Sequence, residues 1–270
     1  MDKLRESSKF SIAEGKTLDV STLKKYSGEK SLSTVRQKMA EAQTGLDTVM
    51  MFDITGSMFS YFHAVRENLD NIARRLKSAV PKLRQAVFGY RNHGDERLYD
   101  EILITTPLTE NVELIGQKIF SIKRGGGGLD ALTCLEDALA AANRLDWNEN
   151  AAKTLVIIGD MPPHGVMDQV TKCPNKIDYR QEVEKLIFRQ VKLYSVFCGH
   201  EKKAEGFFRS VAERSGGKFM SFDEIGLLSE LLIGVGMKSV GRFETYIKQA
   251  KELNLFLPAA KREKIIKLLE

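Results

Sequence analysis

The sequence LDTVMMFD at residues 46–53, followed by ITGS at residues 54–57, decides the fold of this chain. The first eight residues form a short apolar run between two glycines, which is typical of a strand buried in a sheet. The segment after it carries apolar residues at steps of three and four, at Phe62, Val65, Leu69, Ile72 and Leu76. This spacing predicts an amphipathic helix that packs against the strand. A buried strand followed by a packed helix favours an α/β fold.

The alternation of strand and helix continues to residue 235. Further strands are expected at residues 85–90, 101–106, 154–160, 191–197 and 218–222. Further helices are expected at residues 112–122, 133–145, 179–190, 204–215 and 225–235. We therefore predict an α/β, doubly wound and Rossmann-like fold, with a mostly parallel central sheet and helices on both faces. In such a sheet, ligands bind beyond the carboxyl ends of the strands.

The composition excludes several classes of protein. Of the 270 residues, 43% are hydrophobic and 29% are charged, which is ordinary for a soluble globular protein. The longest purely apolar runs have four or five residues, whereas a membrane-spanning helix needs about 18–20. The charged N-terminus lacks the apolar core of an export signal. Three widely spaced cysteines without a CxxC pair support neither a disulfide framework nor a structural zinc knot, so we expect a reducing, cytoplasmic location.

The net charge of +5 is concentrated in the two ends of the chain. Residues 1–45 have a net charge of +3 and residues 237–270 a net charge of +4, whereas residues 46–236 have a net charge of −2. We predict an N-terminal extension at residues 1–43, a main domain at residues 44–236 and a C-terminal helical extension at residues 237–270. The C-terminal extension is expected to form two amphipathic helices divided by Pro258.

Oxygen-bearing side chains follow the expected strands and favour a metal site. Three of them alternate from the last residue of the first strand onward, others follow a glycine run at residues 125–128, and one ends the strand at residues 154–160. Parallel packing would bring these three loops to one edge of the sheet. Carboxylate and hydroxyl oxygens suit Mg²⁺, with Mn²⁺ or Ca²⁺ as alternatives, rather than zinc. The candidate ligands are Asp53, Thr55, Ser57, Thr133, Asp160 and, as an alternative in the middle loop, Asp130.

These motifs resemble those of von Willebrand factor type A domains. The D-x-T-G-S stretch at residues 53–57 is similar to the D-x-S-x-S motif of the metal-ion-dependent adhesion site of that family. The stretch TCLEDAL at residues 133–139 is similar to the family pattern T-x-T-G-x-A-L. The stretch VIIGDMPPHG at residues 156–165 and the glycine-rich loop are closest to the subgroup found with α-kinases. The resemblance covers about residues 44–222.

The resemblance implies a role for each candidate ligand. Thr55 and Ser57 would bind the metal directly, and Thr133 would do so in a ligand-occupied state. Asp53 and Asp160 would act mainly through water molecules and hydrogen bonds, and the carboxylate of a partner would complete the octahedron. Thr55 replaces the usual first serine but retains the hydroxyl. Asp130 aligns with the acidic residue of the α-kinase-linked subgroup and Thr133 with the general threonine, so either can be the middle-loop ligand.

We therefore predict a cytoplasmic, non-enzymatic adaptor domain in which Mg²⁺ captures an Asp or Glu side chain of a protein partner. Such a domain would act within a multi-protein complex, for example with an ATPase or a kinase, by analogy with the fold alone. One alternative is a metal-dependent hydrolase or phosphatase on the same loops, with His93 or His164 as acid or base. The other is nucleic-acid binding through the basic flanks.

Several further residues have ordinary interpretations. His93, His164 and His200 follow expected strands, but histidines in polar turns are the commoner case. Cys198 is expected to be a small buried residue, because no neighbouring base would activate it. The glycine run lacks the Walker pattern of a nucleotide-binding loop. Aspartyl phosphotransferases need a second Asp at the position of Thr55, which argues against covalent phosphoryl transfer.

Overall fold

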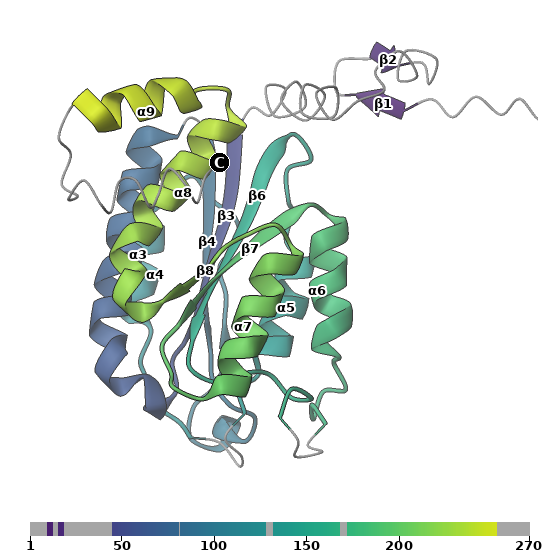
Figure 1. Cartoon of the computed structure of the whole chain (residues 1–270). Helices are drawn as coiled ribbons and strands as arrows, with labels where there is room; N and C mark the ends of the chain where they lie inside the picture. Colours follow the sequence, from purple (N-terminus) through teal and green to yellow (C-terminus); the bar gives the residue numbers. More distant parts are fainter. Residues whose placement is uncertain are drawn as a thin grey trace, which may run out of the picture.

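The computed structural model describes residues 10–12, 16–18, 45–80, 82–127, 132–167 and 172–252. Its centre is a six-stranded sheet with the strand order β5-β4-β3-β6-β7-β8 (Figure 1). Four of the five strand pairs are parallel, and only β4 and β5 are antiparallel. This confirms the predicted mostly parallel α/β sheet. The strands are β3 (Gly45–Asp53), β4 (Leu83–Tyr90), β5 (Leu103–Ile104), β6 (Ala151–Gly159), β7 (Val191–Phe197) and β8 (Phe219–Ser221).

Helices cover both faces of the sheet, as predicted (Figure 1). The first face is covered by α3 (Phe59–Ala79), α4 (Val112–Ser121) and α8 (Ile225–Ser239), and the second face by α5 (Leu135–Asn143), α6 (Tyr179–Phe188) and α7 (Lys202–Arg214). A further helix, α9 (Phe243–Glu252), packs on α8, where the Tyr246 hydroxyl donates to the carbonyl of Glu230 at 3.2 Å. None of the helices in the described ranges is long and apolar enough to cross a membrane.

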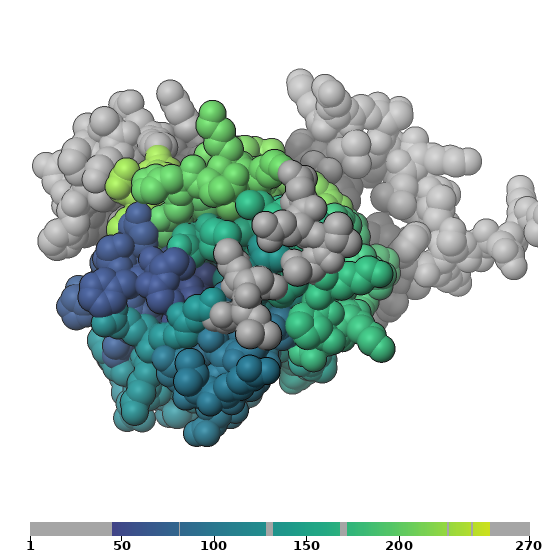
Figure 2. All heavy atoms as spheres, turned by 90° about the horizontal axis from the view of Figure 1, so that it is seen from below, coloured from purple at the N-terminus to yellow at the C-terminus, as the bar shows by residue number. Residues whose placement is uncertain are grey.

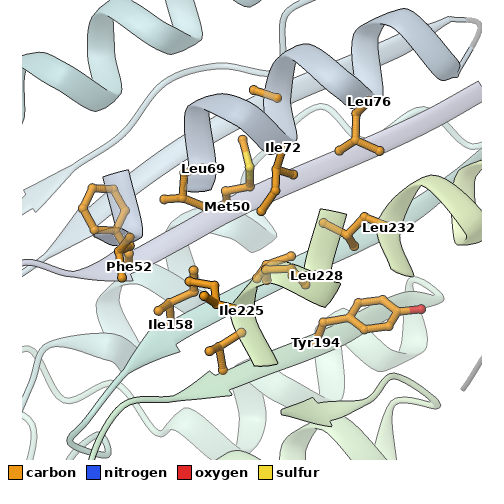
Figure 3. Close-up of a cluster of buried hydrophobic side chains, with 14 of the residues drawn as sticks. Met50, Phe52, Leu69, Ile72, Leu76, Ile158, Tyr194, Ile225, Leu228 and Leu232 are labelled. Atoms are coloured by element: carbon orange, nitrogen blue, oxygen red, sulfur yellow. The ribbon is translucent and has the colours of Figure 1, made fainter. Parts of the chain in front are cut away.

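The continuous apolar run of β3 follows from its position in the middle of the sheet. Met50 and Phe52 point to the first face, where they pack with α3 and α8 (Figure 3). Val49 and Met51 point to the second face and pack with α5 and α7. Since both faces are covered, every residue of β3 is buried. Burial of each large apolar side chain contributes about 1.5–3 kcal/mol, so strands of this kind hold the two layers of helices together.

Three sequence-based expectations need correction in their boundaries. The strand expected at residues 101–106 is reduced to Leu103–Ile104, because the Thr106 hydroxyl accepts a hydrogen bond from the backbone N–H of Val87 in place of a regular strand pair. The helix expected from residue 133 begins at Leu135, because Thr133 forms a bridge with Pro163. The helix expected at residues 225–235, α8, runs to Ser239, four residues past its expected end.

The predicted extensions lie largely outside the described residues. Of residues 1–43, the structure describes two short antiparallel strands, β1 (Phe10–Ile12) and β2 (Lys16–Leu18). Of the two helices expected in residues 237–270, the first corresponds to α9. The second, after Pro258, lies outside the described residues, as does Asp130. The division of the chain into three parts therefore stays a prediction.

Candidate functional site

The candidate metal site lies at the carboxyl ends of β3 and β6, on the face that Figure 2 views from below. Asp53 is the last residue of β3 and is fully buried. Its Oδ1 accepts a hydrogen bond from the backbone N–H of Thr55 at 2.8 Å, which turns the chain out of the strand. Asp160 follows the last residue of β6, the strand that pairs with β3. The two acidic residues predicted from the sequence are therefore neighbours.

The two carboxylates repel each other in a dry environment. Burial, together with the nearby negative charge of Asp160, raises the pKa of Asp53 to about 8. Asp53 Oδ2 and Asp160 Oδ1 are buried, and neither receives a hydrogen bond from the described part of the chain. Buried polar atoms are normally satisfied. Two such oxygens side by side fit a bound cation, whose positive charge would favour the ionised carboxylates.

The hydroxyls of the β3 loop lie beside this acidic pair. Thr55 Oγ1 and Ser57 Oγ are 3.1 Å apart. The loop is tied to the glycine run, because the N–H of Gly56 donates to the carbonyl of Gly126 at 3.0 Å. A Cβ at Gly56 would lie 2.9 Å from that carbonyl oxygen, so glycine permits the close approach of the two loops.

Thr133 occupies the neighbouring loop but faces the chain after Asp160. Its hydroxyl donates weakly to the carbonyls of Met161 and Pro162, at 3.4 and 3.5 Å. The structure thus places Thr133 beside the β6 loop, and Asp130 lies outside the described residues. The choice between them as the middle-loop ligand stays open. We call Asp53, Thr55, Ser57, Thr133 and Asp160 the oxygen cluster. Its donors are the hard oxygens that Mg²⁺ prefers.

A second group of polar side chains, which we call the mixed cluster, lies at the same edge of the sheet. It is formed by buried residues whose possible ligand atoms all lie within 4.8 Å of one another: His93, Glu136, Asp137 and Cys173. His93 follows β4, the two acidic residues stand in the first turn of α5, and Cys173 precedes α6. These four residues come from three separate loops or turns and share no local motif, so the sequence did not single them out as a set.

Histidines balance the acidic residues of the mixed cluster. His93 Nε2 lies 3.0 Å from Asp137 Oδ2 and 3.5 Å from Glu136 Oε1, and His164 Nδ1 lies 2.6 Å from the same Glu136 oxygen. His93 and His164 stand in turns, as expected, but both side chains are buried and both contact Glu136. His200 is exposed, and Cys198 is buried as predicted.

The pKa values in the mixed cluster follow from this pairing. Burial disfavours the charged form of His93, but its hydrogen bonds with Asp137 and Glu136 outweigh that effect and raise the pKa to about 9. Burial acts to raise the pKa of Glu136, but the hydrogen bonds with His164 and His93 prevail and lower it to about 2. Burial, assisted by the nearby carboxylates, raises the pKa of the Cys173 thiol to about 12.

Comparison with known proteins supports the fold. No family model matches the chain, and neither does any curated protein. Among solved structures, the chain is similar to the pilus adhesin SpaC of Lactobacillus rhamnosus GG in its open conformation, with 12% identity and a TM-score of 0.55 over 74% of this chain. The chain spans only 30% of SpaC, and at this identity the likeness shows a shared fold alone. The conserved hypothetical protein BatB of Bacteroides thetaiotaomicron matches 69% of this chain and 96% of its own length, with 12% identity and a TM-score of 0.47.

Proposed function

We propose that this chain is a von Willebrand factor A-type adaptor domain that binds a protein partner through Mg²⁺ held by the oxygen cluster. The observation that carries the proposal is the pair of buried, unsatisfied oxygens on Asp53 and Asp160 beside the Thr55 and Ser57 hydroxyls. Two carboxylates in one buried place are stable together when a cation lies near them. The motif resemblance, including its α-kinase-linked subgroup, adds the expectation that the metal faces outward to a partner.

Each residue of the oxygen cluster has a distinct part in this proposal. The hydroxyls of Thr55 and Ser57 would hold the cation, and Thr133 or Asp130 would approach it from the middle loop. Asp53 is held in place by the N–H of Thr55, so its free oxygen would orient a water molecule on the cation. A divalent cation supplies positive charge for an Asp or Glu of the partner. Because few carboxylates would contact it directly, much of that charge would remain available.

The first test measures cation binding by the purified full chain. Calorimetric titration with Mg²⁺ should show binding that is weakened at least tenfold by Asp53→Ala and by Thr55→Val. Asp146→Asn is the matched control, because its fully exposed side chain precedes the amino end of β6, at the opposite edge of the sheet. Equal Mg²⁺ affinity in the wild type and both site variants would overturn the proposal.

The second test concerns the partner. Capture of partners from the source cell should be lost in EDTA, restored by Mg²⁺ and absent for Asp53→Ala. Capture that is unchanged in EDTA and in the variant contradicts metal-dependent binding.

The proposed absence of enzymatic activity is tested with a panel of phosphate esters and Mg²⁺ or Mn²⁺. Turnover that disappears in Asp160→Ala would favour the hydrolase alternative instead.

A further inference from the structure

We infer that the mixed cluster is a structural zinc site, separate from the magnesium site proposed above. The chemistry of the donors distinguishes the two. The oxygen cluster offers carboxylates and hydroxyls, whereas the mixed cluster offers one imidazole nitrogen, one sulfur and two carboxylates. Nitrogen and sulfur donors favour zinc over magnesium, since Mg²⁺ prefers oxygen alone.

The distances between donor atoms suit a four-coordinate ion. Zinc bonds of about 2.0–2.3 Å place neighbouring ligand atoms roughly 3.3–3.8 Å apart in a tetrahedron. Cys173 Sγ lies 3.7 Å from His93 Nε2 and 3.7 Å from Asp137 Oδ2. His93 Nε2 lies 3.0 Å from Asp137 Oδ2. Only small movements would therefore be needed to receive the ion.

One oxygen of each carboxylate is held by a neighbouring side chain. Asn175 Nδ2 donates to Asp137 Oδ1 at 2.6 Å, which leaves Oδ2 near His93 and Cys173. Glu136 Oε1 lies 2.6 Å from His164 Nδ1. Glu136 Oε2 is fully buried and has no hydrogen-bond partner in the described part of the chain. A buried, unsatisfied oxygen on one of the possible metal ligands is an independent indication of a cation.

The position of the cluster indicates a structural role. An ion held there would join the loop after β4, the first turn of α5 and the loop before α6. His164 and Asn175 would orient the ligands from outside, as the neighbours of metal ligands commonly do. Three negative ligands would more than balance Zn²⁺, and two of them stand at the N-terminus of α5, where negative charge is favoured.

The test uses the untagged full chain and begins with its metal content. Elemental analysis after purification without added metal should find about one zinc ion per chain. Replacing zinc with Co²⁺ should produce the ligand-to-metal absorption of a thiolate and the visible bands of a tetrahedral ion. A chain that binds no zinc after incubation with Zn²⁺, or a Co²⁺ spectrum without a thiolate band, overturns the proposal without any variant.

Variants then assign the ligands. Cys173→Ser and His93→Ala should each weaken zinc binding at least a hundredfold in competition with a chromogenic chelator, and His164→Ala should weaken it about 10- to 100-fold. Cys198→Ser is the matched control, because Cys198 is also buried but lies outside the cluster. Asp53→Ala should leave zinc binding unchanged, which separates this site from the oxygen cluster. Wild-type zinc affinity in both Cys173→Ser and His93→Ala would refute the assignment.

Discussion

The oxygen cluster and the mixed cluster lie at the same edge of the sheet but balance their charges differently. In the oxygen cluster, Asp53 and Asp160 are neighbours, neither forms an ion pair with a basic side chain among the described residues, and the pKa of Asp53 rises to about 8. In the mixed cluster, His93 and His164 contact Glu136, and the pKa of Glu136 falls to about 2. In the metal-free chain, the first site needs a proton on Asp53, whereas His93 supplies positive charge to the second. Two sites at one edge of the sheet therefore differ in the groups that neutralise their carboxylates.

The largest expected difference between the clusters is in stability without metal. In EDTA at neutral pH, Glu136→Gln should lower the free energy of unfolding by about 3–5 kcal/mol, because it removes the buried carboxylate that contacts both His164 and His93. Asp53→Asn should instead raise it by several kcal/mol, because folding at this pH requires Asp53 to take up a proton, whereas Asn is neutral in both states and keeps an acceptor for Thr55. Urea unfolding monitored by circular dichroism measures both. Equal losses in the two variants would show that the clusters do not differ in this way.

The second prediction concerns pH. Asp53 has a folded-state pKa of about 8 against 3.8 for the unfolded chain, so its contribution is full below about pH 4 and is lost as pH rises to 8. His93 acts in the same direction between 6.5 and about 9. Glu136 acts in the opposite direction, because its contribution is present above 4.5 and is lost as pH falls towards 2.

The metal-free chain should therefore lose several kcal/mol of stability between about pH 4 and pH 8, with a slope of at most about 1.4 kcal/mol per pH unit from Asp53. The unfolding free energy is measured across this range in EDTA. Asp53→Asn should flatten the slope below pH 6.5, where His93 contributes little. An identical pH profile in the variant would contradict the assignment of this slope to Asp53.

The third prediction is stabilisation by Mg²⁺ through the oxygen cluster. A ligand that binds only the folded chain adds about 2.7 kcal/mol at a hundred times its Kd. Thermal unfolding should show this gain in the wild type and in Asp146→Asn, and should lose it in Thr55→Val. In Cys173→Ser the gain should persist, because that residue belongs to the mixed cluster. Loss of the Mg²⁺ effect in Cys173→Ser would show that the two sites are coupled.

The smallest expected effect comes from the glycine contact that shapes the oxygen cluster. Gly56→Ala should destabilise the chain by about 1–2 kcal/mol and weaken Mg²⁺ binding, because the new Cβ would lie 2.9 Å from the Gly126 carbonyl oxygen. Gly127→Ala is the control, since a Cβ there meets nothing within 4 Å. Denaturant unfolding and Mg²⁺ titration compare the two. Similar effects of both substitutions would mean that the contact at Gly56 has no special importance.

Much of the fold could be predicted because each regular element carries its own periodicity. The strand at β7 was predicted at the residues that the structure shows, and β3 and β6 differ by only a few residues. The short β5 was overestimated, because the Thr106 side chain replaces a backbone partner of β4. The helix α5 begins later than expected, because Thr133 pairs with Pro163, which is distant in sequence. Boundaries set by such long-range contacts leave no local pattern.

The two candidate sites also differ in how far the sequence alone predicts them. Asp53, Thr55 and Ser57 are close in sequence and follow a recognisable strand, so local order alone indicated a common site. Asp160 could be added because parallel strands end at one edge of the sheet. The mixed cluster cannot be assembled from the sequence, although His93 and His164 each follow an expected strand. Nothing in the spacing of Glu136 and Cys173 shows that they meet.

The sequence by itself determined the class of fold and the oxygen-rich loops of one site, because both depend on residues that are neighbours along the chain. Only the tertiary structure decided which side chains are buried together, and therefore which charges are balanced. Burial and the distance to an opposite charge govern the ionisation of Asp53, Glu136 and His93. Those quantities arise when loops far apart in the chain pack against one another, so the chemistry of the second cluster became visible only in three dimensions.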